Sequence, residues 1–289
     1  MAEHDIENAG TGTRLVGAGR RAEWTGTAAH PGAVVNPPVY RASTHLYPDM
    51  AALRAHPANV DGNFYYGRRG APTQWALAEA LTALEPGAAK DGGGTVLYPS
   101  GVAAIMGALL TVLRPGDVLL MTDNAYEPSR AMGRGLLKDF GIETRWFDPL
   151  DVAAFAAAIC ERTKAVLLES PGSLTMEVCD VPALAAAAKA RGVAVVLDNT
   201  WASPLGFPAL ARGADITIMS LTKHVGGHSD AMMGSASAGA EWYRKLRLRA
   251  QGLGNVVSPD DASLMLRGLR TMGVRLAHET ASALAIAEW

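Results

Sequence analysis

One lysine, Lys223, has the surroundings that nucleophilic amine chemistry requires. It lies between the hydroxyl residues Ser220 and Thr222 and before the pair Gly226-Gly227, just after the apolar run 215–219. A lysine in a desolvated site loses much of its preference for the charged form and can form a Schiff base with a carbonyl compound. The hydroxyls could bind a phosphate, and the glycines let the backbone approach a ligand closely. An exposed lysine on a turn is the alternative for Lys223 taken alone.

Polar or small residues also stand at the ends of other apolar runs. Asp198 ends the strongly apolar run 193–197, and an unpaired carboxylate in that place would be costly. A protonated pyridine nitrogen would serve as its partner, and an aspartate that caps a turn is the alternative. Gly101 and Val102 are expected to open a helix, where free N–H groups favour an anion. Ser100 before them can also act as a plain N-cap.

Four more residues are candidates for ligand contact. Tyr126 and Ser173 each follow an apolar run, so that the ring could stack on a flat ligand and the serine could face it. A tyrosine at the start of a helix is, however, more often simple packing. Tyr66 and Arg68 precede a helix that Pro72 opens, and a guanidinium binds phosphate oxygens in pairs. Arginines that stay solvated on a surface loop are the alternative.

From Gly94 onward, short apolar runs alternate with alanine-rich helical runs that must position these residues. Continuous apolar strands between helices indicate an α/β fold with a mostly parallel sheet, which binds ligands at the carboxyl ends of its strands. The predicted strands are 95–98, 117–122, 142–147, 164–169, 193–198, 215–219 and 231–236. The predicted helices are 72–84, 101–113, 127–140, 151–161, 180–191 and 240–250.

Gly101, Tyr126, Ser173, Asp198 and Lys223 all fall at that same type of position. Together they describe a phosphate cradle, a stacking ring, an acid partner for a ring nitrogen and a nucleophilic amine. These are the requirements of pyridoxal 5'-phosphate, so the sequence predicts a site for this cofactor.

Composition excludes several other classes of protein. The chain has 289 residues and a net charge of -2, which argues against the basic face of a nucleic-acid binder. No apolar run reaches the ~18 residues of a membrane span, and the acidic N-terminus is no signal peptide. Cys160 and Cys179 lack C-x-x-C spacing, which favours reduced thiols and a cytoplasmic location. No metal site is expected, because His224 and His228 flank Gly226-Gly227, which disfavours the helix needed to align them.

Seven segments carry a more specific likeness: 66–70, 126–129, 146–149, 169–178, 198–201, 222–223 with 227–230, and 268–271. In this order they resemble the Cys/Met-metabolism family of pyridoxal-phosphate enzymes, and the likeness runs from about Thr13 to the last residue. Glu127-Pro128 and Ser173 resemble the β-lyase branch of that family. The resemblance implies fold type I and β-elimination of L-cystathionine to homocysteine, pyruvate and ammonia.

The resemblance also implies a role for each candidate residue. Lys223 would join the cofactor and act as the catalytic base, Asp198 would pair with the pyridine nitrogen, and Tyr126 would stack on the ring and assist proton transfer. Ser173 would lie near the substrate. The phosphate would be held by Gly101, Val102, Ser220 and Thr222, and by Tyr66 and Arg68 from the neighbouring subunit of a homodimer or homotetramer.

Three segments are expected: an N-terminal arm over 1–62, a large cofactor-binding domain over 63–269, and the start of a C-terminal domain over 270–289. Family members continue well beyond this length, into a lobe whose arginine grips the substrate carboxylate, and that arginine has no counterpart here. The alanine-rich helix that ends at Glu288-Trp289 has no stop signal, so the chain is expected to be a fragment of a longer protein. A lobe supplied from elsewhere is the alternative. A related C–S lyase acting on cystine, cysteine or methionine is one alternative function, and a truncated chain that binds the cofactor without efficient turnover is another.

Overall fold

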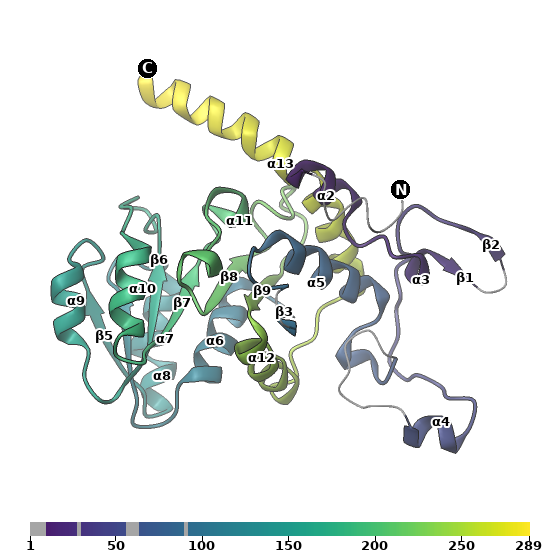
Figure 1. Ribbon diagram of the computed structural model, residues 1–289, viewed down its shortest axis with the longest axis horizontal. Coiled ribbons are helices and arrows are strands. Elements are labelled where there is room, and N and C mark those ends of the chain that lie inside the picture. Colours follow the sequence, from purple (N-terminus) through teal and green to yellow (C-terminus); the bar gives the residue numbers. More distant parts are fainter. Residues whose placement is uncertain (1–9, 28–29, 56–63, 90–91) are drawn as a thin grey trace.

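A seven-stranded sheet organises the fold (Figure 1), for which the computed structural model describes residues 10–27, 30–55, 64–89 and 92–289. The strands lie in the order β3-β9-β8-β7-β6-β4-β5, and of these seven β9 runs against the others. The strands are β3 Gly94–Tyr98, β4 Val118–Thr122, β5 Glu143–Phe147, β6 Thr163–Glu169, β7 Ala194–Asp198, β8 Ile216–Ser220 and β9 Gly234–Ala238. The predicted α/β class with a mostly parallel sheet is confirmed.

Helices cover both faces of the sheet because its central strands are apolar on both sides (Figure 1). On β4, Leu119 and Met121 join the cluster formed with α6, α7, α8 and α12, whereas Val118 and Leu120 join the cluster formed with α9 and α10. Complete burial of one such side chain stabilises the fold by roughly 1.5–3 kcal/mol. The helices are α5 Pro72–Leu84, α6 Gly101–Val112, α7 Glu127–Arg134, α8 Leu136–Asp139, α9 Val152–Ala158, α10 Val181–Lys189, α11 Ser203–Gly206, α12 Ala240–Gly252 and α13 Pro259–Glu288.

Most predicted elements differ from the observed ones by one to three residues at their ends, and two of the differences have a clear local cause. The predicted helix 127–140 is broken at Gly135, whose φ of -112° and ψ of -93° are not helical, into α7 and α8. The predicted strand 231–236 begins later, at Gly234. Met233, the residue before it, bonds to Thr222 in the turn after β8 instead of to a neighbouring strand. There the N–H of Met233 donates to the Thr222 hydroxyl oxygen at 3.2 Å.

The described parts of the N-terminal arm contain short elements that the sequence did not predict. They are α2 Thr11–Gly17, α3 Ala22–Thr25, the paired strands β1 Gly26–Thr27 and β2 His30–Ala33, and α4 Met50–Ala55. Leu15 on α2 and Trp24 on α3 are buried in one cluster with α5 and α13. These elements are too short to show a clear apolar period, and for α2 and α3 packing on the larger helices stabilises them.

Helix α13 begins at a well-formed cap and projects from the body of the molecule (Figure 1). The Ser258 hydroxyl accepts hydrogen bonds from the N–H groups of Asp260 and Asp261, which satisfies donors that the first turn leaves free. The expected boundary between 269 and 270 falls inside this one helix, so the domain division remains a prediction. Among the residues that the structure describes, α13 included, no helix combines the length and apolar character that crossing a membrane requires.

Glu85 is a buried carboxylate at the end of α5, where its Oε1 accepts the N–H of Leu210 at 3.1 Å. Burial raises the pKa of Glu85 from 4.5 to about 7. Between these values the folded chain holds a proton that the unfolded chain has released, so the free energy of unfolding falls as the pH rises through this window. We expect Glu85→Gln to raise the free energy of unfolding at pH 8 by roughly 1–3 kcal/mol, because the amide keeps the acceptor without the charge.

Denaturant unfolding of the wild type and of Glu85→Gln at pH 5 and pH 8 measures this effect. The gain from the substitution should be present at pH 8 and small at pH 5, where Glu85 is already protonated in the folded state. An equal gain at both pH values would show that the buried charge is not its cause.

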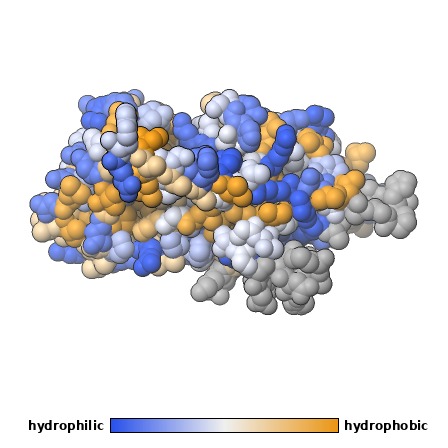
Figure 2. Space-filling model, turned by 90° about the horizontal axis from the view of Figure 1, so that it is seen from above, coloured by the Kyte–Doolittle hydropathy of each residue, from blue (hydrophilic) through white to orange (hydrophobic). Residues whose placement is uncertain are grey.

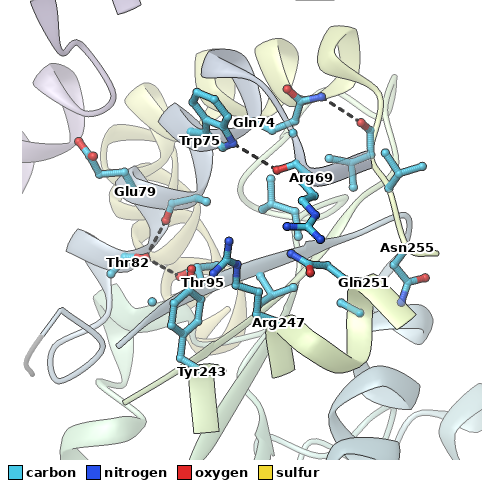
Figure 3. Close-up of a pocket in the computed structure, with 18 of the residues that line it drawn as sticks. Arg69, Gln74, Trp75, Glu79, Thr82, Thr95, Tyr243, Arg247, Gln251 and Asn255 are labelled. Carbon is cyan, nitrogen blue, oxygen red and sulfur yellow. Dashed lines mark hydrogen bonds between the residues drawn. The ribbon is translucent and has the colours of Figure 1, made fainter. Parts of the chain in front are cut away.

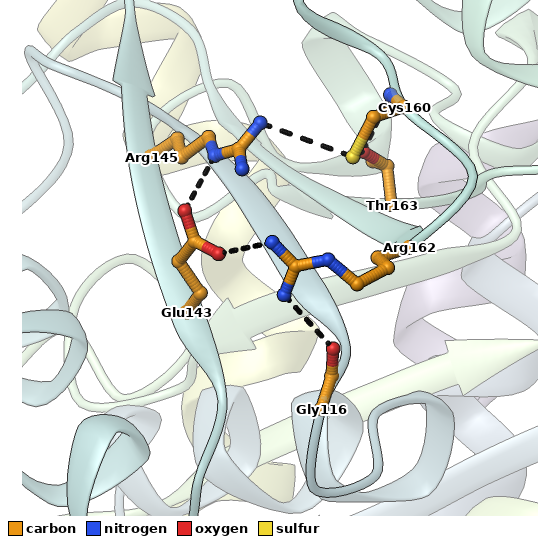
Figure 4. Close-up of polar contacts among 6 residues, drawn as sticks. All are labelled: Gly116, Glu143, Arg145, Cys160, Arg162 and Thr163. Atoms are coloured by element: carbon orange, nitrogen blue, oxygen red, sulfur yellow. Dashed lines mark hydrogen bonds and ion pairs between the residues drawn. The ribbon is translucent and has the colours of Figure 1, made fainter.

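The two cysteines lie in opposite environments, and Figure 4 shows that of Cys160. Its Sγ lies 3.4 Å from the Thr163 hydroxyl and 3.8 Å from Nη1 of Arg145, which also donates from Nε to Glu143. The hydrogen bond from Thr163, with a smaller contribution from Arg145, lowers the pKa of the Cys160 thiol. Burial raises the pKa of the Cys179 thiol. Because the thiolate is the reactive form, Cys160 should be the more reactive of the two.

We expect iodoacetamide at pH 7.5 to modify Cys160 faster than Cys179 by about tenfold or more. Mass spectrometry of the digested protein follows both rates in one experiment. In the Cys160→Ser variant, the fast phase should disappear and the slow modification of Cys179 should remain. Equal rates for the two thiols would contradict the prediction.

Candidate active site

The parallel strands β6, β7 and β8 lie side by side and end at one edge of the sheet, toward the top of Figure 1. Glu169 at the end of β6 is in register with Asp198 at the end of β7, and β8 ends at Ser220. Because these strands are parallel neighbours, the side chains at their ends share one edge of the sheet, where α/β sheets bind ligands. Figure 2 views the molecule from above, where hydrophobic residues form an interrupted band among hydrophilic ones.

Lys223 lies on a tight turn directly after β8. Its N–H donates to the carbonyl oxygen of Ser220 at 3.1 Å, and the N–H of Gly226 donates to that of Leu221 at 2.7 Å. Leu221 and Val225 are buried in the cluster formed with α5 and α13, whereas Lys223 between them is exposed. The turn thus anchors its apolar residues in the core and leaves the lysine side chain outside.

Arg275 on α13 fastens the far side of this turn. Its Nη2 donates to the carbonyl oxygens of His224 at 2.7 Å and Gly268 at 2.9 Å. A Cβ at Gly227 would lie 2.4 Å from Nη1 of Arg275, and the φ of +75° at this residue also favours glycine. Sequence reasoning missed Arg275, because 51 positions along the chain separate it from His224.

The first turn of α6 packs directly against the end of β8. A Cβ at Gly101 would lie 2.7 Å from that of Ser220, so only the absence of a side chain allows this approach. The Ser100 hydroxyl accepts the N–H of Ala103 at 3.1 Å, which confirms the expected N-cap. The N–H groups of Gly101 and Val102 belong to the turn that has no intrahelical partners. They lie next to Ser220 in an arrangement that suits an anion.

Thr222 takes part in a different way. Its hydroxyl oxygen donates to the carbonyl of Met233 at 3.3 Å and accepts the N–H of the same residue at 3.2 Å. These bonds fasten the lysine turn to the segment that leads into β9. Both contacts occupy the hydroxyl, although its oxygen still has a second lone pair for a ligand.

Asp198 ends β7 without a cationic partner among the described residues. Its Oδ1 accepts the N–H of Thr200 at 3.0 Å, and the Thr200 hydroxyl, which accepts the N–H of Ser220, also bonds to this carboxylate. The side chain keeps some solvent contact at the sheet edge, yet the surrounding protein raises the pKa of Asp198 by desolvation. A buried carboxylate in this state favours a cationic ligand. The carboxylate and the anion cradle together fit a ligand that carries both a protonated ring nitrogen and a phosphate.

Glu169 is a second acid at this edge and was not predicted as a site residue. Its Oε2 accepts the backbone N–H of Tyr126 at 2.7 Å, at the start of α7. Burial and the nearby charge of Asp198 raise the pKa of Glu169 to about 7. The available signal was an acid at the end of an apolar strand, which is the same signal that identified Asp198.

Tyr126 and Ser173 lie on adjoining loops at the rim. Tyr126 is 44% exposed, so the residue is accessible to a ligand at the rim. The N–H of Ser173 donates to the carbonyl of Asn124 at 2.9 Å, and a Cβ at Gly172 would lie 2.1 Å from the Asn124 amide. These contacts hold the loop after β6 against the loop after β4.

Tyr66 and Arg68 lie at other hollows. Arg68 is on the short 3₁₀ helix η1 Gly67–Arg69, and its Nη1 donates to the carbonyl of Gln251 on α12 at 2.8 Å. Figure 3 shows the pocket beside it, with a volume of about 430 Å³, where α5, β3 and α12 meet. Neither Lys223 nor Asp198 lines this pocket. Tyr66 borders a second hollow near α4. Within one chain, therefore, the structure does not bring these two residues to the strand ends.

The chain matches the sequence profile of the family described as Cys/Met metabolism PLP-dependent enzyme over residues 13–289. It is 42% identical over 280 residues to cystathionine beta-lyase MetC of Escherichia coli (strain K12), an alignment that covers 96% of this chain and 68% of that protein. It is 41% identical over 280 residues to the cystathionine beta-lyase of Salmonella typhimurium (strain LT2), with the same coverage.

The chain is also similar to the crystal structure of metB from Corynebacterium glutamicum, with a TM-score of 0.81 and 28% sequence identity. The superposition covers 93% of this chain and 66% of that one. The likeness in structure thus extends over most of this chain.

Proposed function

Because the chain belongs to the Cys/Met metabolism PLP-dependent enzyme family, we propose that it catalyses β-elimination from L-cystathionine. With the uptake of one water, the products are homocysteine, pyruvate and ammonia. The observation that carries the proposal is a lysine turn after β8, next to β7, whose last residue Asp198 has no cationic partner in the part of the chain that the structure describes. Helix α6 begins at the same sheet edge. The names of the two relatives at 41–42% identity support cystathionine as the substrate.

The residues at the strand ends divide among the parts of the cofactor. The N–H groups of Gly101 and Val102, with the hydroxyls of Ser220 and Thr222, would hold the phosphate. Asp198 would face the ring nitrogen and keep it protonated, since the ion pair relieves the cost of burying this carboxylate. The exposed side chain of Tyr126 would stack on the cofactor ring, and the amine of Lys223 would bind the aldehyde of the cofactor.

When bound, pyridoxal 5'-phosphate supplies an electron sink for the α-carbon of an amino acid. Lys223 then acts as the general base that takes the proton from this carbon through Nζ. The same amine, or the hydroxyl of Tyr126, gives a proton to the departing sulfur. Ser173, at the rim, would contact the substrate. Backbone hydrogen bonds hold the turn of Lys223. The side-chain amine can therefore move during the reaction while the backbone of the turn stays in place.

A second copy of the chain would complete the site. Arg68 and Tyr66 lie away from Lys223 in one chain, at surfaces where an arginine could reach the phosphate held by a partner. The proposal therefore includes a homodimer or a homotetramer of two such dimers, located in the cytoplasm. It also keeps the division into an arm over 1–62, a cofactor domain over 63–269 and the start of a further domain from 270.

Pyruvate release tests the proposed function directly. The purified protein, loaded with pyridoxal 5'-phosphate, should release pyruvate and homocysteine in equal amounts from L-cystathionine. Cystine, cysteine and methionine are the comparison substrates, and kcat/KM should be highest for cystathionine. A visible cofactor band together with faster turnover of methionine would reject the substrate but not the cofactor chemistry. A protein that takes up no cofactor would reject both.

A further inference from the structure

Glu169 contacts several segments of the candidate site at once. It is the last residue of β6, and its Cα is paired in register with that of Asp198 on β7. Its Oε2 accepts the N–H of Tyr126 at 2.7 Å, and the hydroxyl of Ser173 also bonds to this carboxylate. One side chain thus joins the start of α7 to the loop after β6, next to the end of β7.

We propose that Glu169 is a positioning residue that fixes Tyr126 and Ser173 at the rim of the active site. This inference rests on the proposed function, because only a bound cofactor and substrate give those two side chains a task. The N–H of Tyr126 stands at the N-terminus of α7, where the helix offers it no internal acceptor. Without Glu169 this donor has to find water, and the ring then loses its fixed place.

The charge of Glu169 is compatible with a site built for one cationic ring. The groups that face it are the carboxylate of Asp198 from β7, the backbone N–H of Tyr126 at the cap of α7 and the hydroxyl of Ser173 from the loop after β6. Burial and Asp198 raise the pKa of Glu169 to about 7. Because the pKa of each acid is raised, a cation beside the pair, such as a protonated ring nitrogen, would stabilise their ionised forms.

Two substitutions separate positioning from charge. Glu169→Gln keeps an oxygen that accepts the N–H of Tyr126, whereas Glu169→Ala removes the acceptor. The matched control is Glu85→Gln, because burial also raises the pKa of Glu85 to about 7. Its Oε1 accepts the N–H of Leu210, which is not a site residue. All three variants and the wild type are compared as proteins loaded with pyridoxal 5'-phosphate.

The first measurement is amide hydrogen exchange of the peptide that contains Tyr126. Protection of this amide should be lost in Glu169→Ala and kept in Glu169→Gln and Glu85→Gln. The second is the visible circular dichroism of the bound cofactor, together with kcat and KM for cystathionine. Glu169→Ala should lower the dichroism and reduce kcat/KM by about 10- to 100-fold, which matches the loss of one hydrogen bond to a charged group. Glu169→Gln should stay within about threefold of the wild type at pH 6.5.

Wild-type exchange, dichroism and kinetics in Glu169→Ala would overturn the proposal, as would losses of equal size in Glu85→Gln. If the protein binds no cofactor, the proposed function fails, while hydrogen exchange still shows whether Glu169 holds Tyr126. Loss of protection in Glu169→Ala without any change in dichroism or kcat/KM would leave Glu169 a structural contact and reject its role in the site.

Discussion

Lys223→Ala abolishes the visible absorbance that bound pyridoxal 5'-phosphate gives and lowers kcat/KM for cystathionine by about 10⁴-fold or more. The substitution removes both the amine that joins the cofactor and the base that takes the α-proton. It leaves the turn intact, because the bonds that form the turn run between backbone groups and the buried anchors are Leu221 and Val225. The melting temperature of the cofactor-free protein should therefore change little. Absorbance spectra and pyruvate release measure the first two effects.

Lys164→Ala is the matched control for this experiment. Lys164 is also exposed, and its Nζ donates to the carbonyl of Glu161, at the opposite end of β6 from Glu169. This variant should keep the visible band and full activity. A Lys223→Ala protein that retained the band would reject Lys223 as the point of attachment, whatever its rate of turnover.

The sheet could be predicted from the sequence because its signal is local. Each of the runs 117–122, 164–169 and 193–198 is apolar at consecutive positions, which only a strand buried on both faces requires. The start of α5 at Pro72 was equally local, since proline is favoured in the first helical turn. Because the carboxyl ends of parallel strands lie at one edge of a sheet, the pattern of strands alone predicted one shared edge for the candidate residues that follow them.

The features that sequence reasoning missed depend on contacts between distant segments. Arg275 holds the turn of Lys223 across 51 positions, and Glu169 reaches the backbone of Tyr126 across 43. Neither contact leaves a periodic pattern in the sequence. Helix α2 was missed because one buried leucine, Leu15, gives no apolar period. The break at Gly135 shows the limit of the helical pattern, since a glycine inside a helical run can either continue the helix or end it.

The positions of Tyr66 and Arg68 show a different limit. The sequence assigned them to a phosphate, but in one chain Arg68 bonds to α12 at the pocket of Figure 3. The sequence alone does not show whether a residue contacts a site in its own chain or in a second copy of the chain. Their role therefore depends on the proposed dimer, whereas those of Lys223 and Asp198 do not.

Asp198→Asn should have opposite effects on stability and on activity. The amide keeps the oxygen that accepts the N–H of Thr200, but it removes a carboxylate whose pKa desolvation raises. The pKa of Asp198 is raised above its usual value of 3.8, so at higher pH the ionisation of this carboxyl opposes folding. The free energy of unfolding of the wild-type cofactor-free chain therefore falls as the pH rises above 3.8. At pH 8 the asparagine variant without cofactor should therefore have a higher free energy of unfolding than the wild type.

The same variant should lose roughly 10²- to 10³-fold in kcat/KM, since position 198 no longer supplies the carboxylate that would pair with the ring nitrogen and keep it protonated. The cofactor should also dissociate more readily on dialysis, which absorbance measures. Such opposite effects are typical of a residue selected for catalysis instead of folding, because a purely structural aspartate would stabilise the fold in its ionised form. Glu85→Gln again provides the control: it should share the gain in stability at pH 8 and keep full activity. If Asp198→Asn destabilised the cofactor-free chain, Asp198 would be a structural residue, and the pairing with a ring nitrogen would lose its physical basis.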